Sequence, residues 1–280
     1  MKTLRIVIIL WLLGATPAKA ASFGGVEEWY LYPSLQYFTW EEFSNGSRLL
    51  KESGVLAGFG AAVHINLLRT ESVGDLMLRG RGELFGGVAD YDGLTTGATL
   101  GLEELPVKTG TDYFGAKQEA DVGWRFPVAP VAIEPFAGLG YRWWLRSIRN
   151  SSTRDNSGNL VRVQGYDEWW QTVYTRLGVR GSHPVGRELK MFAEGGAKYP
   201  LYSRNEADFP GVGNVILEPG GAWSGFAEVG FRYRSFRQSF YYEGFRFSQS
   251  PTVRVGKGVG LLQPKSDSDI FGITVGWAFR

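Results

Sequence analysis

Two histidines are the first residues in this sequence that could do chemistry. His64 lies in "VLAGFGAAVHINLL", residues 55–68, and His183 stands beside Pro184. A catalytic histidine needs a nucleophile or an acid held at hydrogen-bond distance. We find no His and Ser pairing that indicates a lipid deacylase, and no metal-ligand spacing. We therefore predict no catalytic residue, no metal and no cofactor, with His64 a polar residue inside the fold and His183 a solvated turn residue.

Charged residues that alternate with apolar ones form the second candidate set. In residues 113–126, one face carries Phe114, Ala116, Ala120, Val122, Trp124 and Phe126, and the other carries Lys117, Glu119, Asp121 and Arg125. A period of two is the side-chain period of a β-strand. The segment at 55–68 has the same period, with an apolar face opposite a face of Gly, His and Asn. Such strands need an apolar environment on one side and a polar one on the other.

The same alternation predicts ten strands. They are residues 28–43, 53–68, 75–89, 113–126, 130–148, 166–181, 188–201, 222–235, 236–248 and 267–279. In residues 236–248 aromatic residues fall on both faces, so the register of that strand stays open. Short links alternate with long ones, and the long links are 44–52, 90–112, 149–165, 202–221 and 249–266. This alternation is typical of an even-numbered up-and-down meander with turns at one rim and loops at the other.

The first 20 residues read as a cleaved signal peptide, which leaves residues 21–280 as one domain. Lys2 and Arg5 precede an apolar run, and "AKA" follows it before Ala21. The whole chain has 30 basic and 28 acidic residues, and removing Lys2, Arg5 and Lys19 leaves 27 basic ones. A nearly neutral chain gives no reason to expect nucleic-acid binding. The chain has no cysteine, so no disulfide holds it together.

A soluble all-β protein would also show alternation, because its strands bury one face in a core. Long strands and two bands of aromatic residues favour a membrane barrel instead. We expect a periplasmic aromatic girdle of Trp124, Phe126, Trp277 and Phe279. We expect an outer girdle of Trp143, Trp144, Trp169, Trp170 and Trp223. The predicted fold is an all-β, antiparallel transmembrane barrel of about ten strands, with short periplasmic turns, long extracellular loops and both termini in the periplasm.

The leader, the stretch "PFAGLGYRWW" at 135–144 and the last strand "DIFGITVGWAFR" carry a resemblance to known proteins. The chain resembles the small outer-membrane β-barrel proteins of Gram-negative bacteria, in the OmpA-like and porin-like sense. It departs from them in ending on Arg280 rather than on the aromatic Phe279. The resemblance implies an integral outer-membrane barrel without an appended periplasmic domain. It also implies the barrel assembly machinery, membrane lipid and lipopolysaccharide as partners, and we expect a monomer.

Inside such a barrel, the polar faces predict which charged residues line the lumen. They are Arg79, Arg81, Glu83, Lys117, Glu119, Asp121, Arg125, Glu134, Arg142, Arg146, Arg176, Arg180, Lys190, Glu194, Lys198, Glu228, Arg232, Arg234 and Glu243. In this set the basic residues outnumber the acidic ones. Two interpretations stay open in a narrow ten-stranded tube: ion pairs that fill the lumen, or a thin water path whose arginines favour anions.

Three functions follow from this fold. The first is a structural barrel or a narrow channel for small polar or anionic solutes. The second is a surface protein that binds a host, phage or lipopolysaccharide partner through its outer loops, chiefly 90–112 and 202–221. The third is an outer-membrane hydrolase. The omptin proteases resemble this chain in strand number, but the resemblance implies an Asp and His pair at the outer rim, where our topology places no histidine.

Overall fold

The computed structural model describes residues 22–70, 73–95, 104–255 and 259–279, so the predicted signal peptide and Arg280 lie outside the described residues. The described chain consists of strands and their connections. No helix among these residues is long and apolar enough to cross a membrane.

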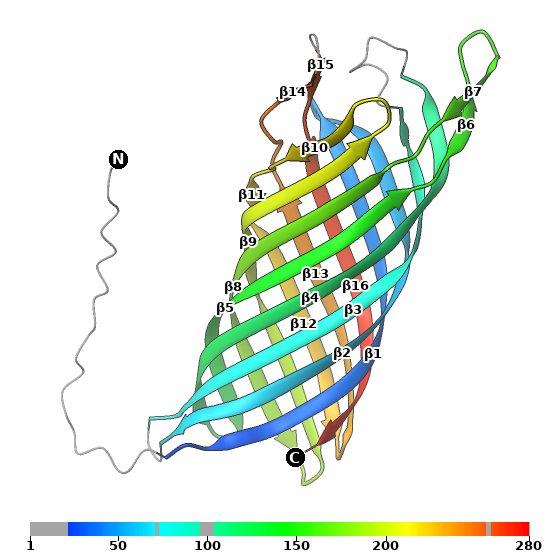
Figure 1. Cartoon of the computed structure of the whole chain (residues 1–280). Helices are drawn as coiled ribbons and strands as arrows, with labels where there is room; N and C mark the ends of the chain where they lie inside the picture. Colours follow the sequence, from blue (N-terminus) through cyan, green and yellow to red (C-terminus); the bar gives the residue numbers. More distant parts are fainter. Residues whose placement is uncertain (1–21, 71–72, 96–103, 256–258, 280) are drawn as a thin grey trace, which may run out of the picture.

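Ten strands form one closed barrel (Figure 1). In chain order they are β1 (Gly25–Ser44), β2 (Ser47–Arg69), β3 (Asp75–Leu94), β4 (Pro106–Val128), β5 (Val131–Ile148), β8 (Asp167–Val185), β9 (Leu189–Phe209), β12 (Ser224–Tyr233), β13 (Phe236–Phe247) and β16 (Lys265–Phe279). Each strand pairs antiparallel with its neighbour in the chain order, and β1 pairs with β16 to close the circle. The predicted all-β, ten-stranded, up-and-down barrel is confirmed.

Several strands extend further than the apolar alternation indicates. β2 begins at Ser47 rather than at residue 53, β4 begins at Pro106 rather than at 113, and β9 ends at Phe209 rather than at 201. Strand pairing needs only backbone groups, so it continues past the point where the outer side chains become polar. These extensions matter for the site, because they carry charged side chains that the sequence pattern leaves in loops.

The two ends of the barrel differ, as predicted. Both described termini, the adjacent ends of β2 and β3 at Arg69 and Asp75, and the turns at 129–130, 186–188 and 234–235 lie at one end, which we call the turn end. The other end, the loop end, carries the longer connections. The prediction of a long loop at 44–52 is wrong, because Asn45 and Gly46 form a two-residue turn with φ of 50° and 82°. Asn-Gly is the preferred sequence for such a hairpin turn.

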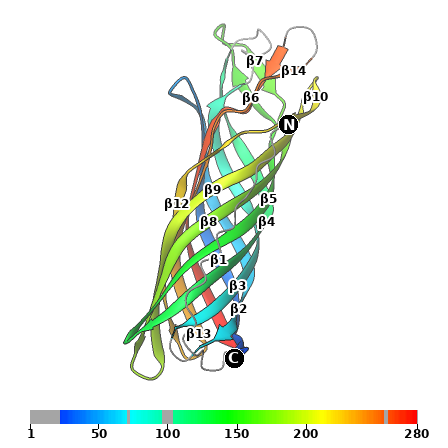
Figure 2. The same cartoon turned by 90° about the vertical axis from the view of Figure 1, so that its left-hand side faces the viewer.

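Three other predicted loops contain small strands. β6 (Ser151–Arg154) and β7 (Leu160–Val163) form a hairpin within 149–165, and β10 (Gly213–Leu217) pairs with β9. β11 (Gly221–Ala222) pairs with β13, and β14 (Val253–Val255) pairs with β15 (Val259–Leu261). Figures 1 and 2 show these pieces gathered at the loop end.

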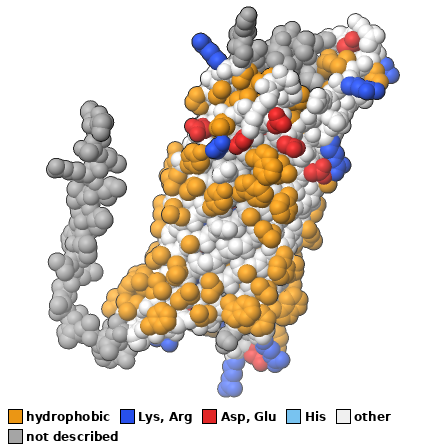
Figure 3. Space-filling view, in the orientation of Figure 1, with side chains coloured by type: hydrophobic (Ala, Val, Ile, Leu, Met, Phe, Trp, Pro, Cys, Tyr) orange, Lys and Arg blue, Asp and Glu red, His pale blue; other side chains and the backbone are white. Residues whose placement is uncertain are grey.

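The outer wall is largely apolar. Leu84, Phe114 and Leu139 are each more than half exposed, as are Val55 and Phe59 from the segment that alternates with glycine. Hydrophobic side chains cover the middle and lower wall on the face in Figure 3, and charged ones gather towards the two ends. A soluble monomer rarely exposes so large an apolar surface. A closed barrel also leaves no strand edge unpaired, as a lipid environment requires.

Most of the predicted girdle residues lie on the outer wall. At the turn end Trp29 stacks on Phe279 with ring centroids 4.3 Å apart, and Trp277 is 52% exposed. On the loop-end side Trp143 packs against Trp169 at 5.7 Å. The remaining outward members are Trp124, Phe126 and Trp223. Trp144 and Trp170 do not belong to the girdle, and their place is described below.

Candidate functional site

The lumen is the candidate site, and small residues on the strands make room for its large side chains. A Cβ atom on Gly60 would lie 2.3 Å from the ring of Tyr32, and one on Gly140 would lie 2.2 Å from the ring of Tyr174. Glycine at these inward positions therefore lets a tyrosine from the neighbouring strand lie flat across the wall. This explains the glycine-rich inner face of residues 55–68.

An aromatic layer crosses the lumen towards the loop end. It consists of Trp40, Trp144, Trp170 and Phe247, all at most 4% exposed. The rings of Trp144 and Trp170 stack at 5.3 Å with planes 8° apart, and Trp40 meets Trp170 edge-on at 4.9 Å. The prediction that Trp144 and Trp170 belong to the outer girdle is therefore wrong. Side chains alternate along a strand, so each Trp-Trp pair places one ring in lipid and the other in the lumen.

Arg146 holds three carboxylates beside this layer. Its guanidinium nitrogens lie 2.8 Å from Glu52, 2.8 Å from Glu168 and 3.5 Å from Glu42. The Nε1 atoms of Trp40 and Trp170 donate hydrogen bonds to Glu42 and Glu168 at 2.9 and 2.8 Å. Arg146 is 1% exposed and Glu52 is fully buried.

Arg142 lies deeper and is held differently. Its guanidinium carbon lies 4.6 Å from the ring centroid of Phe85, 5.4 Å from that of Trp144 and 5.3 Å from that of Phe245. Stacking on aromatic faces stabilises a cation by about 0.5–2 kcal/mol per contact. Among the described residues, the ion pairs of the lumen do not include Arg142.

Two lysines and two glutamates cross the middle of the lumen. Lys117 Nζ lies 2.8 Å from Glu243 Oε2, and Lys198 also pairs with Glu243. Lys198 Nζ then reaches Glu119 at 3.2 Å. Glu243 comes from β13, the strand whose register the sequence left open, and its odd-numbered residues from Arg237 onward face inward. The ion pairs therefore run across the tube as well as around its wall.

Below that layer the pairs become denser. Glu119 also bonds Arg81, at 2.6 Å, and Arg176. Arg81 reaches Glu228 at 3.1 Å, and Arg176 reaches Glu194 at 3.0 Å. Glu119 thus pairs with several cations, and Arg81 and Arg176 each pair with more than one carboxylate. Such sharing leaves little unpaired charge in a poorly hydrated space.

Arg180 connects the next group of carboxylates. It lies 3.2 Å from Glu134 and 2.5 Å from Glu194, and it also pairs with Asp121. Arg79 bonds the other oxygen of Glu134 at 2.5 Å.

Ion pairs continue to the turn end. Arg125 bonds Glu27 at 2.6 Å and Asp75 at 2.8 Å, and Arg232 lies 3.4 Å from Glu28.

The predicted lumen residues other than Arg234 are all placed on the inner face. Arg234 lies instead in the turn between β12 and β13, with a φ of 54° and an ion pair to Glu188.

The predicted surplus of basic residues in the lumen is wrong. Six further carboxylates face the described lumen: Glu27, Glu28, Glu42, Glu52, Asp75 and Glu168. With them, and with Arg237 added and Arg234 removed, thirteen acidic side chains meet twelve basic ones among the described residues. Most of the six lie near strand ends, where the apolar alternation that would identify an inward position has stopped.

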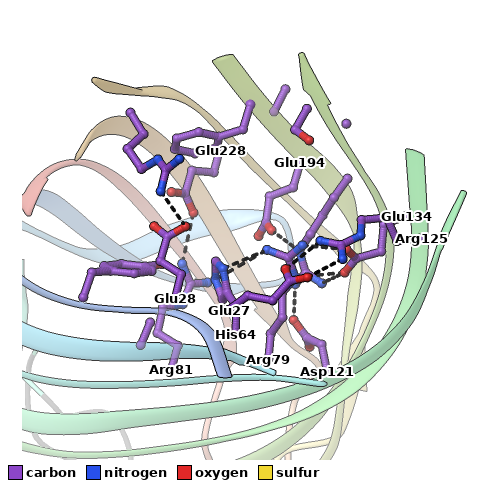
Figure 4. A pocket seen from close by; sticks show the side chains of 18 of the residues that line it. Glu27, Glu28, His64, Arg79, Arg81, Asp121, Arg125, Glu134, Glu194 and Glu228 are labelled. Atoms are coloured by element: carbon purple, nitrogen blue, oxygen red, sulfur yellow. Dashed lines mark hydrogen bonds and ion pairs between the residues drawn. The ribbon is translucent and has the colours of Figure 1, made fainter. Parts of the chain in front are cut away.

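In the described part of the chain, two cavities are found between these side chains. One, of about 90 Å³, lies among His64, Arg79, Lys190 and their neighbours towards the turn end (Figure 4). The other, of about 20 Å³, lies near Tyr241 and Lys198. Neither is lined by a residue of the aromatic layer.

Both histidines lie towards the turn end. Arg79 Nη1 is 3.4 Å from each ring nitrogen of His64, and the ring of Tyr30 meets His64 edge-on at 5.6 Å. His183 Nδ1 lies 3.3 Å from the carbonyl oxygen of Pro130 in a turn. In the described part of the chain, neither histidine has an Asp or Ser side chain at hydrogen-bond distance. No group of three or more metal-ligating side chains is found there either.

The fold has counterparts among solved structures. The outer membrane protease OmpT from Escherichia coli has a TM-score of 0.61 and 10% identity, over 92% of this chain and 98% of that chain. A major outer membrane protein from Thermus thermophilus has a TM-score of 0.36 and 14% identity, over 88% and 99%. The toluene transporter TodX from Pseudomonas putida has a TM-score of 0.37 and 9% identity, over 92% and 90%.

No family model and no curated protein matches the chain. Identities this low concern the fold alone, and the OmpA-like or porin-like resemblance is supported only at the coarser level of outer-membrane barrels. The chain therefore has the fold of an outer-membrane β-barrel protein.

Proposed function

We propose that this protein is a closed structural barrel of the bacterial outer membrane, with its turns and termini in the periplasm, and that its lumen does not conduct solutes. The observation that carries the proposal is the pairing of the lumen charges. An open anion path needs basic side chains that face water, whereas here Arg146, Arg176 and Arg180 each pair with three carboxylates.

The aromatic layer supports the same proposal. Trp40, Trp144, Trp170 and Phe247 fill the cross-section beside the Arg146 cluster with apolar rings. Water and ions pass poorly through an apolar constriction, which gates by excluding water. The lumen then contributes stability and a rigid wall rather than a route through the membrane.

Single-channel recording tests this proposal. The refolded mature protein is inserted into a planar bilayer with a salt gradient across it, and a porin in the same bilayer serves as the positive control. We expect a silent bilayer although the protein has folded and inserted. Steady openings with anion preference would contradict the proposal and favour the narrow-channel alternative.

A second function, partner binding at the loop end, is favoured by one further observation. Val215, Leu217 and Leu261 are at most 7% exposed and pack with Phe209, Val253 and other side chains into a small apolar cluster. The connections that carry them are therefore packed rather than extended into solvent. A packed loop surface can present fixed contacts to a partner.

We propose that this loop-end surface binds other molecules and that the protein is not an enzyme. OmpT is a protease, but at 10% identity the likeness extends to the fold and not to the reaction. The omptin resemblance implies a histidine at the outer rim, and the two histidines of this chain lie at the opposite end. Binding of lipopolysaccharide to the wild type and to a variant that shortens 210–220 would test the loop-end function, which predicts loss of binding in the variant.

A further inference from the structure

The larger cavity lies among charged side chains that converge from several strands (Figure 4). Its volume is about 90 Å³. One buried water needs roughly 10–15 Å³, so the cavity has room for several waters or for one small solute. The side chains of Arg79 and Arg125 on its wall keep 21% and 18% of their surface exposed. The cavity is therefore reached by solvent.

Lys190 faces this cavity without a carboxylate partner. Among the described residues, no ion pair or hydrogen bond of its ammonium group is found, in contrast to Lys117 and Lys198 higher in the lumen. Among the described residues, the other charged side chains that line the cavity are seven arginines and seven carboxylates, so that Lys190 is the surplus cation.

His64 lines the same cavity, and Arg79 Nη1 lies 3.4 Å from both of its ring nitrogens. A cluster of cations with a single free ammonium is costly in a partly buried space unless an anion joins it.

Each carboxylate that lines the same cavity has an arginine partner, but Oε1 of Glu28 and Oδ1 of Asp121 accept no hydrogen bond among the described residues. Both oxygens of Glu27 accept hydrogen bonds from Arg125, at 2.6 and 2.8 Å. Glu134 is shared between Arg79 and Arg180. Glu27 and Glu134 therefore do not move to Lys190 without breaking a pair elsewhere, whereas Glu28 pairs with Arg232 through Oε2 alone. None of the described carboxylates forms an ion pair with the ammonium group of Lys190, which leaves that role to an external anion.

We propose that the turn-end cavity is a binding site for one small oxyanion, such as inorganic phosphate, sulfate or a short carboxylate. Lys190 supplies the main charge, and Arg79 lies on the wall of the same cavity. The site goes beyond the proposed structural role and does not depend on it.

Calorimetric titration of the refolded mature protein in detergent tests the proposal, with inorganic phosphate, sulfate and acetate as separate ligands and chloride as the control anion. We expect saturable binding of at least one oxyanion. The variant Lys190→Gln should weaken that binding by at least about tenfold, because it removes the unpaired charge.

The matched control is Lys108→Gln. Lys108 pairs with Asp92 at the loop end, and its side chain is 83% exposed, so this variant should bind as the wild type does. The absence of oxyanion binding in the folded wild type would overturn the proposal. Equal affinities of wild type and Lys190→Gln would overturn it as well.

A second variant covers the case in which Lys190→Gln does not fold. Ser182 lines the same cavity on β8, diagonal to Lys190 on β9. The variant Ser182→Asp supplies an internal carboxylate within reach of the ammonium group and removes no charge from the wall. It should fold and lose oxyanion binding, and unchanged binding would contradict the site. The bilayer recording is independent of both results, so the two proposals can fail separately.

Discussion

At the scale of single residues, the lumen contains two ways of holding a buried arginine. Arg146 is surrounded by carboxylates, whereas Arg142 lies among aromatic faces. Removing a cation from a cluster of buried carboxylates leaves their charge uncompensated, and this costs about 3–5 kcal/mol. The identity of the partner therefore decides how much each arginine matters for stability.

We expect the variant Arg146→Met to lower the free energy of unfolding by about 3–5 kcal/mol, since Glu42, Glu52 and Glu168 lose their shared cation. Urea unfolding in lipid vesicles measures the change. The control is Arg149→Met, which removes an exposed ion pair with Asp112 and should change the free energy of unfolding far less, because solvent screens this pair. Equal losses of unfolding free energy in the two variants would show that Arg146 is not needed to neutralise the buried carboxylates.

A second residue-scale prediction concerns His64. If the barrel is no enzyme, the variant His64→Ala should leave any hydrolysis of peptide or lipid substrates by the purified protein unchanged. Its ring contacts Arg79 and Tyr30 and no nucleophile of the described chain. An activity that is present in the wild type and lost in this variant would return His64 to the catalytic candidates.

At the scale of the strands, glycine on the inner face decides how closely neighbouring strands and their tyrosines pack. Gly140 of β5 faces the ring of Tyr174 on β8, directly opposite it in register. Glycine there is a requirement of packing, since the backbone of β5 is regular. A glycine pattern of this kind is visible in the sequence, but its partner ring is not.

The variant Gly140→Ala should therefore destabilise the barrel by about 1–3 kcal/mol, the usual cost of overpacking. Gly195→Ala is the matched control, because a Cβ atom there meets only the carbonyl oxygen of Phe226 at an ordinary 3.6 Å. Thermal unfolding of both variants in the same detergent gives the comparison. A control that is as unstable as Gly140→Ala would point to a general effect of losing glycine from a strand.

At the scale of the whole molecule, the apolar outer wall should make stability depend on lipid. Leu139 is 56% exposed on the barrel wall, and Leu160 is 66% exposed on the β6–β7 hairpin at the loop end. An arginine near the middle of a bilayer costs about 2–4 kcal/mol in a barrel, and much less near the interface.

Leu139→Arg should therefore lower the free energy of unfolding in vesicles by about 2–4 kcal/mol. Leu160→Arg should be as stable as the wild type. Equilibrium unfolding from vesicles measures both. Equal behaviour of the two variants would place the wall around Leu139 in water and contradict the membrane barrel.

The sequence by itself determined the fold class, the ten strands, the faces of most strands and the two unlike ends. Those features rest on a period of two and on the lengths of connections, which are local properties of the chain. The prediction at 44–52 is wrong because the strands continue through polar residues to the Asn45–Gly46 turn, and the inward faces near Glu42, Glu52 and Glu168 are hidden for the same reason.

Only the tertiary structure decided which inward side chains meet. Arg146 and Glu52 are 94 residues apart in the chain, and Lys117 and Glu243 are 126 apart. Their contacts depend on the register of every intervening strand pair and on closure of the barrel, and alternation specifies a face but not a height along the axis. For that reason only the tertiary structure shows three features: the charge balance of the lumen, the aromatic layer and the Lys190 ammonium group without an ion pair.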